Sequence, residues 1–406
     1  MKLKDYIENG FNSTIRIPNE EESTKGIPLI KPFTVPCNSL AFRELYYWDT
    51  YFINRGMILL NNVEVAKNNI ENFIFLINKL GYVPNGNKNY LNRSQPPLFG
   101  MMVSDYYSVS NDKEFLKVCV DALKKEMLFW EQNRKSENGL NFYSCNADSE
   151  ELKAAVKMYK DRTAIDREWL EEFWGKNILA EAESGWDFNE RFNGKCEQYN
   201  PVDLNSILYF NERFLDYAEM ELGIKSDINW LERAYKRKLL MEKYMLSTDG
   251  VFYDYSYVDN SLSKVVSAAS FFPYYVKMAD DGQGLKKLLE NLELPFGIQA
   301  SISIGEGIYQ WGAKNGWPCL QLIAVEGLLN YERKGDAKRI AYKYVDLVKN
   351  VYKNTGRIWE KYNVENYNES VVAEYNTPEM FGWTAGCYLV IEEIIKKNWG
   401  DNFEQH

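Results

Sequence analysis

Histidine is almost absent from this sequence of 406 residues, because its single histidine, His406, is also its last residue. Histidine is the usual general base near neutral pH and the commonest metal ligand in proteins. A Ser-His-Asp triad, a Cys-His dyad or a histidine-bearing zinc site therefore has no candidate inside the fold. Any catalysis has to use carboxylates, lysine, tyrosine or cysteine, and we expect neither a metal nor a cofactor.

The sequence also lacks a CxxC pair, a linker rich in proline or glycine, and an apolar run long enough to span a membrane. The six cysteines are widely spaced, which is typical of free thiols in a reducing compartment. Residues 1–26 lack the apolar stretch of a signal peptide, so we expect a cytoplasmic protein. The net charge of −10 argues against a nucleic-acid or membrane partner. We expect a monomer acting on a small molecule.

Apolar residues at helical spacing are the dominant pattern along the chain. One such stripe stops at Gly81, a second follows a cap at Asn111 or Asp112, and a third ends near Gly356. Their members are Ala66, Ile70, Phe73 and Ile77; Phe115, Val118, Cys119, Ala122 and Leu123; and Ala337, Ala341, Tyr344 and Val348. Alternating patterns are few, and residues 251–258 are the best strand candidate.

Gly-Trp pairs recur at residues 185–186, 316–317 and 382–383, and the last two precede apolar stretches of helical length. Loops that lead into buried helices in this way suit a helical barrel whose loops converge on one mouth. Roughly a dozen helices fit the chain, and two concentric rings of six are a natural packing. We predict an all-α barrel as a single domain over residues 1–406, with residues 1–30 as a peripheral N-terminal segment. A helical bundle of another form is the alternative.

Two carboxylates stand among aromatic side chains, which make up 15% of the sequence. Asp187 lies between Trp186 and Phe188, and Glu360 lies between Trp359 and Lys361. Cleavage of a glycosidic bond requires one protonated carboxyl and one ionised carboxylate. Aromatic walls exclude water and raise the pKa of the acid, as its role requires. A capping or surface role remains the alternative for any single carboxylate beside a tryptophan.

Longer strings carry a more specific signal. FRELYYWDTYF (42–52), GYVPNGNKNYLNRSQPPLFGMM (81–102), AESGWDF (182–188), PVDLN (201–205), QWGAKNGWPCLQLIAVEGL (310–328), WEKYNV (359–364) and EYNTPEMFGWTAG (374–386) occur in this order. They closely resemble the trehalase family of glycoside hydrolases over about residues 30–395. The resemblance implies an (α/α)6 barrel that hydrolyses α,α-trehalose to two glucoses with inversion of configuration.

The resemblance also implies roles for individual residues. Asp187 stands where the family has its general acid, and Glu360 where it has its general base. Carboxyls of an inverting pair are expected about 6.5–9.5 Å apart, with a water between the base and the sugar. The implied sugar contacts are Phe42, Trp48, Asp49, Asn85, Arg93, Ser94, Gln95, Arg167, Glu168, Gly185, Trp311 and Glu374. A helix N-cap is the competing interpretation for Asp49, and core packing for the tryptophans.

The sequence departs from the family in both signatures. The first usually reads PGGRF, and here residues 36–42 read PCNSLAF, so that Ala41 replaces an arginine. Gly312 and Lys314 replace an aspartate and a proline in the second. Another α-glucoside, or a glucosyl conjugate of a small acid or polyol, is therefore an alternative substrate. Lys314 could pair with an anionic group of such a conjugate or be a solvated surface lysine. A sugar-binding barrel without catalysis is a third hypothesis.

Overall fold

The structure is a computed structural model that describes residues 2–18, 26–38, 42–163, 168, 170–305, 309–369 and 378–400. Helices dominate the described part of the chain. Their bounds are α1 Leu3–Thr14, α2 Tyr47–Leu59, α3 Val63–Leu80, α4 Phe99–Ser110, α5 Lys113–Asn133, α6 Ser149–Thr163, α7 Glu171–Ser184, α8 Val202–Leu222, α9 Trp230–Met245, α10 Phe272–Tyr275, α11 Gln283–Leu292, α12 Pro318–Asn330, α13 Lys334–Thr355 and α14 Gly382–Trp399.

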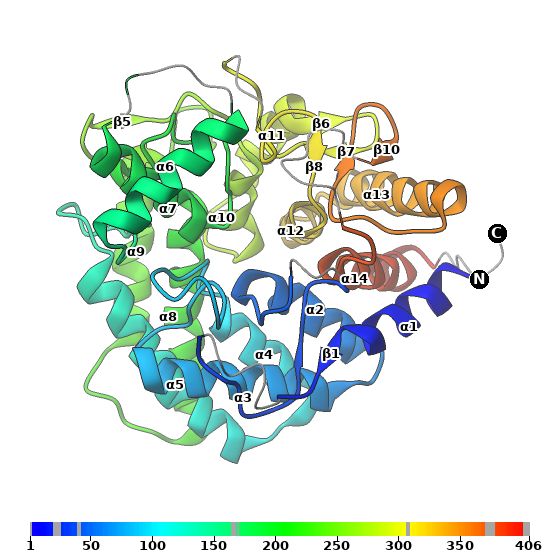
Figure 1. The fold of residues 1–406 in the computed structure, drawn as a ribbon, viewed down its shortest axis with the longest axis horizontal. Coiled ribbons are helices and arrows are strands. Elements are labelled where there is room, and N and C mark those ends of the chain that lie inside the picture. The colour runs from blue at the N-terminus through cyan, green and yellow to red at the C-terminus, as the bar shows by residue number, and fades with distance from the viewer. Residues whose placement is uncertain are drawn as a thin grey trace.

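Two concentric rings of helices form the body of the molecule (Figure 1). The inner ring runs α2, α4, α8, α10, α12 and α14, each packed against the next, and closes where α14 meets α2. Its helices are buried nearly all round, as in α2 and α12. The outer helices α1, α3, α5, α9, α11 and α13 are more amphipathic, as a helix with one solvent face must be. The predicted (α/α)6 barrel is confirmed.

The helix boundaries follow the local signals in the sequence. Helix α3 ends at Gly81, whose φ of 85° is the left-handed conformation that glycine adopts without strain. Helix α5 begins after Asp112, whose side chain accepts a hydrogen bond from the backbone N–H of Phe115 at 3.0 Å. Helix α13 ends before Gly356, as predicted. Val118 differs from its prediction because it lies on the solvent face of α5, 49% exposed.

Short antiparallel strands join the loops at the ends of the helices. They are β1 (Ile15–Arg16) with β2 (Phe33–Thr34), β3 (Tyr199–Asn200) with β4 (Tyr255–Ser256) and β5 (Ser261–Leu262), β6 (Glu293–Leu294) with β7 (Gly297–Ile298), and β8 (Asn315–Gly316) with β9 (Tyr362–Asn363) and β10 (Asn368–Glu369). The strand predicted over 251–258 is limited to β4. The β8–β9 pair places Asn315 opposite Asn363 and so brings two distant loops together.

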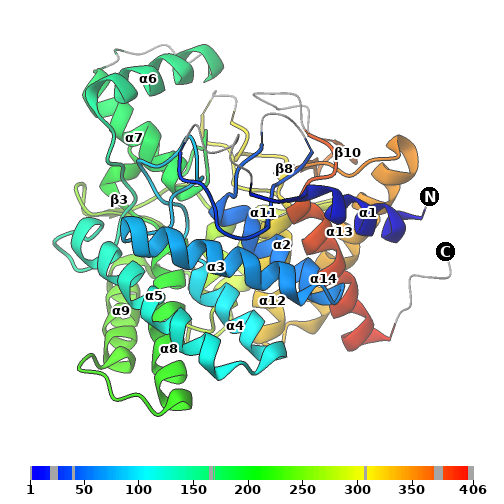
Figure 2. The same cartoon turned by 60° about the horizontal axis from the view of Figure 1, so that its bottom comes forward.

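Helices α6 and α7 form a hairpin that stands above the rings at one edge of the molecule (Figure 2). Its apolar side chains make a small core that is separate from the main one. Phe188 also belongs to this small core. Helix α1 packs against α14 and buries Ile7 and Phe11, so this part of the N-terminal segment belongs to the outer ring rather than lying peripheral to it. Among the described helices, none has an apolar stretch of the length that crossing a bilayer requires.

Candidate active site

A cavity of about 550 Å³ lies at the loop-bearing end of the inner ring. The first turns of α2 and α14, the residue that precedes α12, and the α6–α7 hairpin all contribute to it. Its lining residues are Phe42, Tyr46, Trp48, Asp49, Asn85, Tyr90, Arg93, Gln95, Met158, Tyr159, Arg162, Ile178, Leu179, Glu181, Ala182, Gly185, Asp187, Phe188, Gln310, Trp311, Trp317, Glu360, Phe381 and Trp383. Asp187 and Glu360 therefore face the same space.

Asp187 follows the Gly-Trp pair that ends α7, where Gly185 has a φ of 75°. The pKa of its carboxyl is raised to about 6, chiefly by burial; the charges of Arg93 and Arg162 oppose this rise, and the charge of Glu360 adds to it. Its Oδ1 is buried and has no hydrogen-bond partner among the described residues. The next residue, Phe188, has a positive φ of 57°, a conformation that costs a non-glycine residue roughly 1–2 kcal/mol. A strained turn thus presents the carboxyl to the cavity.

Glu360 lies just before β9 and is held by its neighbour in the chain. Its Oε2 accepts a hydrogen bond from Lys361 Nζ at 2.7 Å, and both side chains are at most 3% exposed. The ammonium of Lys361 also lies 4.8 Å from the centre of the Trp317 ring, over its face. The backbone carbonyl of Glu360 accepts a hydrogen bond from Trp383 Nε1 at 2.9 Å. These contacts fix the carboxylate and supply its counter-ion.

Asp49 is the third carboxyl for which the sequence predicts a role here. Helix α2 begins at Tyr47, so Asp49 lies in its first turn and is not its N-cap residue. Burial, followed by the charge of Glu360, raises the pKa of Asp49 to about 8. Its carboxyl is therefore protonated near neutral pH and offers the cavity one hydrogen-bond donor.

Four tryptophans form one continuous aromatic wall. Trp311 stacks on Trp317 with ring centres 3.7 Å apart and 2° between the planes. Trp383 meets Trp317 edge to face at 5.5 Å, and Trp48 meets Trp311 at 6.3 Å. The backbone N–H of Trp48 donates to Gln95 Oε1 at 2.9 Å. Such a wall offers flat apolar faces to a sugar ring and keeps water out.

Several buried polar atoms of this lining have no hydrogen-bond partner in the part of the chain that the structure describes. They are Arg93 Nε, Gln310 Oε1, Trp48 Nε1 and Asp187 Oδ1. A buried polar atom without a partner costs about 1–3 kcal/mol, and in folded proteins such atoms are rare. Their gathering around one cavity is what a site for a ligand rich in hydroxyl groups requires.

Most predicted sugar contacts line the cavity, and the exceptions have clear locations. Ser94 does not line the cavity; it is fully buried, and its Oγ donates to the Val83 carbonyl at 2.6 Å. Glu168 is exposed, and its carbonyl accepts a hydrogen bond from Trp174 Nε1. Arg167 and Glu374 fall outside the described residues.

The lining also includes residues for which no role was predicted. Tyr90 lies beside the matched NRSQPP string, and the guanidinium of Arg93 lies 4.7 Å over its ring. Gln310 opens the second signature, so its position there could have revealed it. Arg162 comes from the end of α6, in a stretch that matches no motif, and no signal identified it.

The altered positions of the second signature lie away from this lining. Lys314 does not line the cavity; its Nζ pairs with Glu365 at 3.0 Å, and the side chain is 57% exposed. Its interpretation as a surface lysine is confirmed. The anionic-group hypothesis based on Lys314 therefore loses its support.

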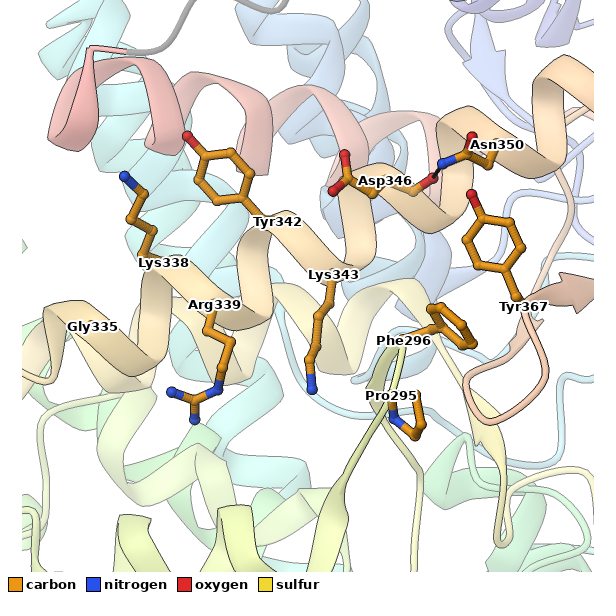
Figure 3. Close-up of a pocket in the computed structure, with 10 residues that line it drawn as sticks. All are labelled: Pro295, Phe296, Gly335, Lys338, Arg339, Tyr342, Lys343, Asp346, Asn350 and Tyr367. Carbon is orange, nitrogen blue, oxygen red and sulfur yellow. Dashed lines mark hydrogen bonds between the residues drawn. The ribbon is translucent and has the colours of Figure 1, made fainter.

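A second hollow, of about 770 Å³, lies on the outer side of α13 beside the β6–β7 turn (Figure 3). Among its described lining residues Asp346 is the one carboxylic acid, and Lys343 and Arg339 are paired with Glu293 instead. Glycoside hydrolysis by an acid and a base requires two opposed carboxyls. The cavity at the mouth of the rings is lined by several carboxyls, Asp187 and Glu360 among them, whereas the described lining of this hollow has one.

Comparison with known proteins identifies the family of the chain. A family model described as trehalase matches residues 3–395. Periplasmic trehalase from Escherichia coli O1:K1 / APEC is 31% identical over 434 residues, which cover 97% of this chain and 74% of that protein. The counterpart from Xanthomonas axonopodis pv. citri is 29% identical over 421 residues, covering 96% and 72%.

Two solved structures have a similar fold. Neutral trehalase Nth1 from Saccharomyces cerevisiae has a TM-score of 0.76 and 26% identity, covering 97% of this chain and 80% of that one. A GH63 mannosylglycerate hydrolase from Thermus thermophilus, with a TM-score of 0.64 and 16% identity over 96% of this chain and 99% of that one, shares the fold.

These findings also correct one expectation. The cytoplasmic location predicted from the N-terminal residues and the cysteines is wrong, because the curated relatives are named periplasmic trehalases and point to the periplasm. The absence of an apolar stretch in residues 1–26 was a weak basis for that prediction. A family model that spans nearly the whole sequence, and relatives aligned over most of their own length, show that the chain belongs to the trehalase family of glycoside hydrolases.

Proposed function

We propose that this protein hydrolyses α,α-trehalose to two glucoses with inversion, using Asp187 as general acid and Glu360 as general base. One observation carries the assignment of roles: the two carboxyls line one cavity but have opposite surroundings. Burial raises the pKa of Asp187 to about 6, whereas Glu360 is paired with the buried ammonium of Lys361. Carboxyls whose environments favour opposite protonation states are what this reaction requires.

The chemical step uses both groups at once. Asp187 gives its proton to the oxygen that bridges the two glucoses, and the bond from this oxygen to the anomeric carbon of one glucose breaks. Glu360 takes a proton from a water that attacks the same carbon from the opposite face. The attacked glucose leaves as the β anomer, and the leaving glucose keeps its α configuration. The two carboxyls return to their starting states after exchange of one proton with solvent.

The remaining lining residues bind and orient the disaccharide. The wall of Trp48, Trp311, Trp317 and Trp383 packs against the sugar faces. Arg93, Gln310 and protonated Asp49 supply hydrogen bonds to hydroxyl groups, which satisfies buried polar atoms that lack a partner among the described residues. We further propose that the chain works as a single-domain monomer and needs no nucleic acid or membrane, in keeping with its net charge of −10.

Glucose release from trehalose tests the proposal. The wild-type protein should release glucose from millimolar trehalose, and Asp187→Asn and Glu360→Gln should lose nearly all of this activity while remaining folded. NMR spectra taken before the anomers equilibrate should show α- and β-glucose in equal amounts. Folded wild-type protein that leaves trehalose intact would refute the proposal. Faster turnover of another α-glucoside in the same assay would keep the mechanism and change the substrate.

A further inference from the structure

A buried ionic cluster lies directly behind the loop that carries Asp187. Arg191 donates to both oxygens of Asp203 at 2.9 Å, and to both oxygens of Asp254 at 2.8 and 3.0 Å. The three side chains are at most 1% exposed. Asp203 belongs to the PVDLN string and lies in the first turn of α8, and Asp254 immediately precedes β4. None of the three residues lines the cavity.

The cluster reaches the catalytic loop through one aromatic ring. The guanidinium carbon of Arg191 lies 4.4 Å from the centre of the Trp186 ring, over its face. Trp186 directly precedes Asp187 and is fully buried, and another aromatic neighbour, Trp311, lies 4.9 Å away in the cavity wall. Trp186 is thus packed between the cluster and the wall.

The backbone of the loop is tied to the same cluster. Asn189 accepts a hydrogen bond from the Arg191 backbone N–H at 2.8 Å and donates its side-chain N–H to the Trp186 carbonyl. The Arg191 carbonyl accepts a hydrogen bond from Ser263 Oγ at 3.0 Å. The Phe188 carbonyl accepts from the Trp311 backbone N–H at 3.3 Å. The loop from Trp186 to Arg191 is therefore held at both ends.

Stability alone does not explain an arrangement of this kind. Burying ions costs free energy that their attraction often fails to recover, so that well-packed apolar side chains would stabilise the fold at least as well. Asp254 shows the cost, because burial raises its pKa despite two hydrogen bonds to Arg191. Four directional hydrogen bonds do fix the position and tilt of a guanidinium plane, which apolar packing does not.

We propose that Arg191, held by Asp203 and Asp254, is a positioning residue for Asp187 and acts through the ring of Trp186. This inference rests on the proposed function, since it assumes that Asp187 is the general acid. It also assigns a role to Asp203 of the PVDLN string, which does not line the cavity. The strained turn at Phe188 needs support of this kind, because a left-handed φ persists only where its surroundings impose it.

The test compares two substrates that differ in their need for a proton. Trehalose needs an acid for its leaving oxygen, whereas the fluoride of α-D-glucosyl fluoride leaves with little help. In Arg191→Lys, which keeps the charge but loses the four-bond geometry, kcat for trehalose should fall about 10- to 100-fold, the cost of a small displacement of a catalytic group. The kcat for the fluoride and both KM values should change little.

Two further variants make the outcome decisive. Trp186→Phe leaves the cluster intact and shrinks the ring beneath Arg191. It should therefore show the same split between substrates, a lower kcat for trehalose with little change for the fluoride, even if Arg191→Lys does not fold. Arg237→Lys is the matched control: Arg237 binds Glu212 through two hydrogen bonds of 3.0 and 2.8 Å, its side chain is 7% exposed, and its other hydrogen bonds go to Asn141 and Asn205 rather than to residues 186–191. It should turn over both substrates like the wild-type protein.

Equal loss on both substrates in folded Arg191→Lys and Trp186→Phe, or no loss on trehalose, would overturn the inference. Asp187→Asn separates this result from failure of the proposed function. If Asp187→Asn shows the split and the Arg191 and Trp186 variants do not, the positioning role alone is wrong. If Asp187→Asn hydrolyses trehalose normally, Asp187 is not the acid and both proposals fail.

Discussion

The carboxylate of Glu360 lies 2.7 Å from the ammonium of Lys361, the next residue in the chain, and both side chains are buried. Lys361 does not line the cavity, so its charge acts on the substrate through Glu360 and through the face of Trp317. Trp317 in turn stacks on Trp311. One lysine thus supports both the proposed base and the wall against which the sugar packs.

Replacement of this lysine should slow the enzyme without removing any group from the cavity lining. Removal of one partner from a buried ion pair costs roughly 3–5 kcal/mol, because the other charge stays buried without compensation. We expect Lys361→Met to lower kcat for trehalose at least about 10-fold. Lys314→Met, which breaks the exposed pair with Glu365, is the control and should leave kcat unchanged. An unaltered kcat in folded Lys361→Met would contradict this role.

The pH dependence of the wild-type enzyme should reveal the acid. Asp187 must be protonated to act, and its pKa of about 6 is above the ordinary value because of burial. The value of kcat/KM for trehalose, which reports the free enzyme, should therefore fall as the pH rises through about 6. Turnover of α-D-glucosyl fluoride should lack this basic limb. A rate that stays level for trehalose up to pH 8 would mean that another group supplies the proton.

Sequence reasoning succeeded where a local pattern has one structural meaning. Gly81 and Asp112 fix the end of α3 and the start of α5 through conformations and hydrogen bonds that involve only neighbouring residues. The Gly-Trp pairs at 316–317 and 382–383 lead into inner helices, as predicted. The pair at 185–186 instead follows α7, because Gly185 is the left-handed residue that ends that helix.

Groups brought together from distant segments could not be predicted in this way. Arg162 reaches the cavity because the α6–α7 hairpin stands over the mouth, which is a tertiary arrangement without a local signal. Ser94 shows the reverse, since a motif match placed it at the sugar and the fold turns its hydroxyl toward a backbone carbonyl. The protonated state of Asp49 depends on burial and on Glu360, 311 positions later in the chain, and neither is visible in the string RELYYWD.

Asp49 should make the protein less stable as the pH rises. Its pKa is about 8 in the folded protein and about 3.9 in an unfolded chain. Below pH 4 the carboxyl is protonated in both states and has no effect on stability. Between about pH 4 and 8 the unfolded chain gains stability by ionising while the folded protein does not, so the free energy of unfolding falls, by an amount on the order of a few kcal/mol.

Asp49→Asn removes this effect and should melt several degrees higher than wild type at pH 8 but close to it at pH 4. Thermal melts across this pH range measure the difference, and Asp121→Asn on the exposed face of α5 serves as control. A melting difference that does not depend on pH would show that Asp49 is ionised in the folded protein.

Arg162 tests whether the α6–α7 hairpin contributes to catalysis. Its charge lowers the pKa of Asp187 against the effect of burial. In Arg162→Met the pKa of Asp187 should rise, and the acid should remain protonated to higher pH. The basic limb for trehalose should therefore move upward, by about half a pH unit or less because Arg162 is exposed to solvent. Lys157→Met removes a charge from the same helix without touching the cavity, and it should leave the limb in place. If both variants moved the limb equally, the effect would come from the net charge of the hairpin and not from the position of Arg162 over Asp187.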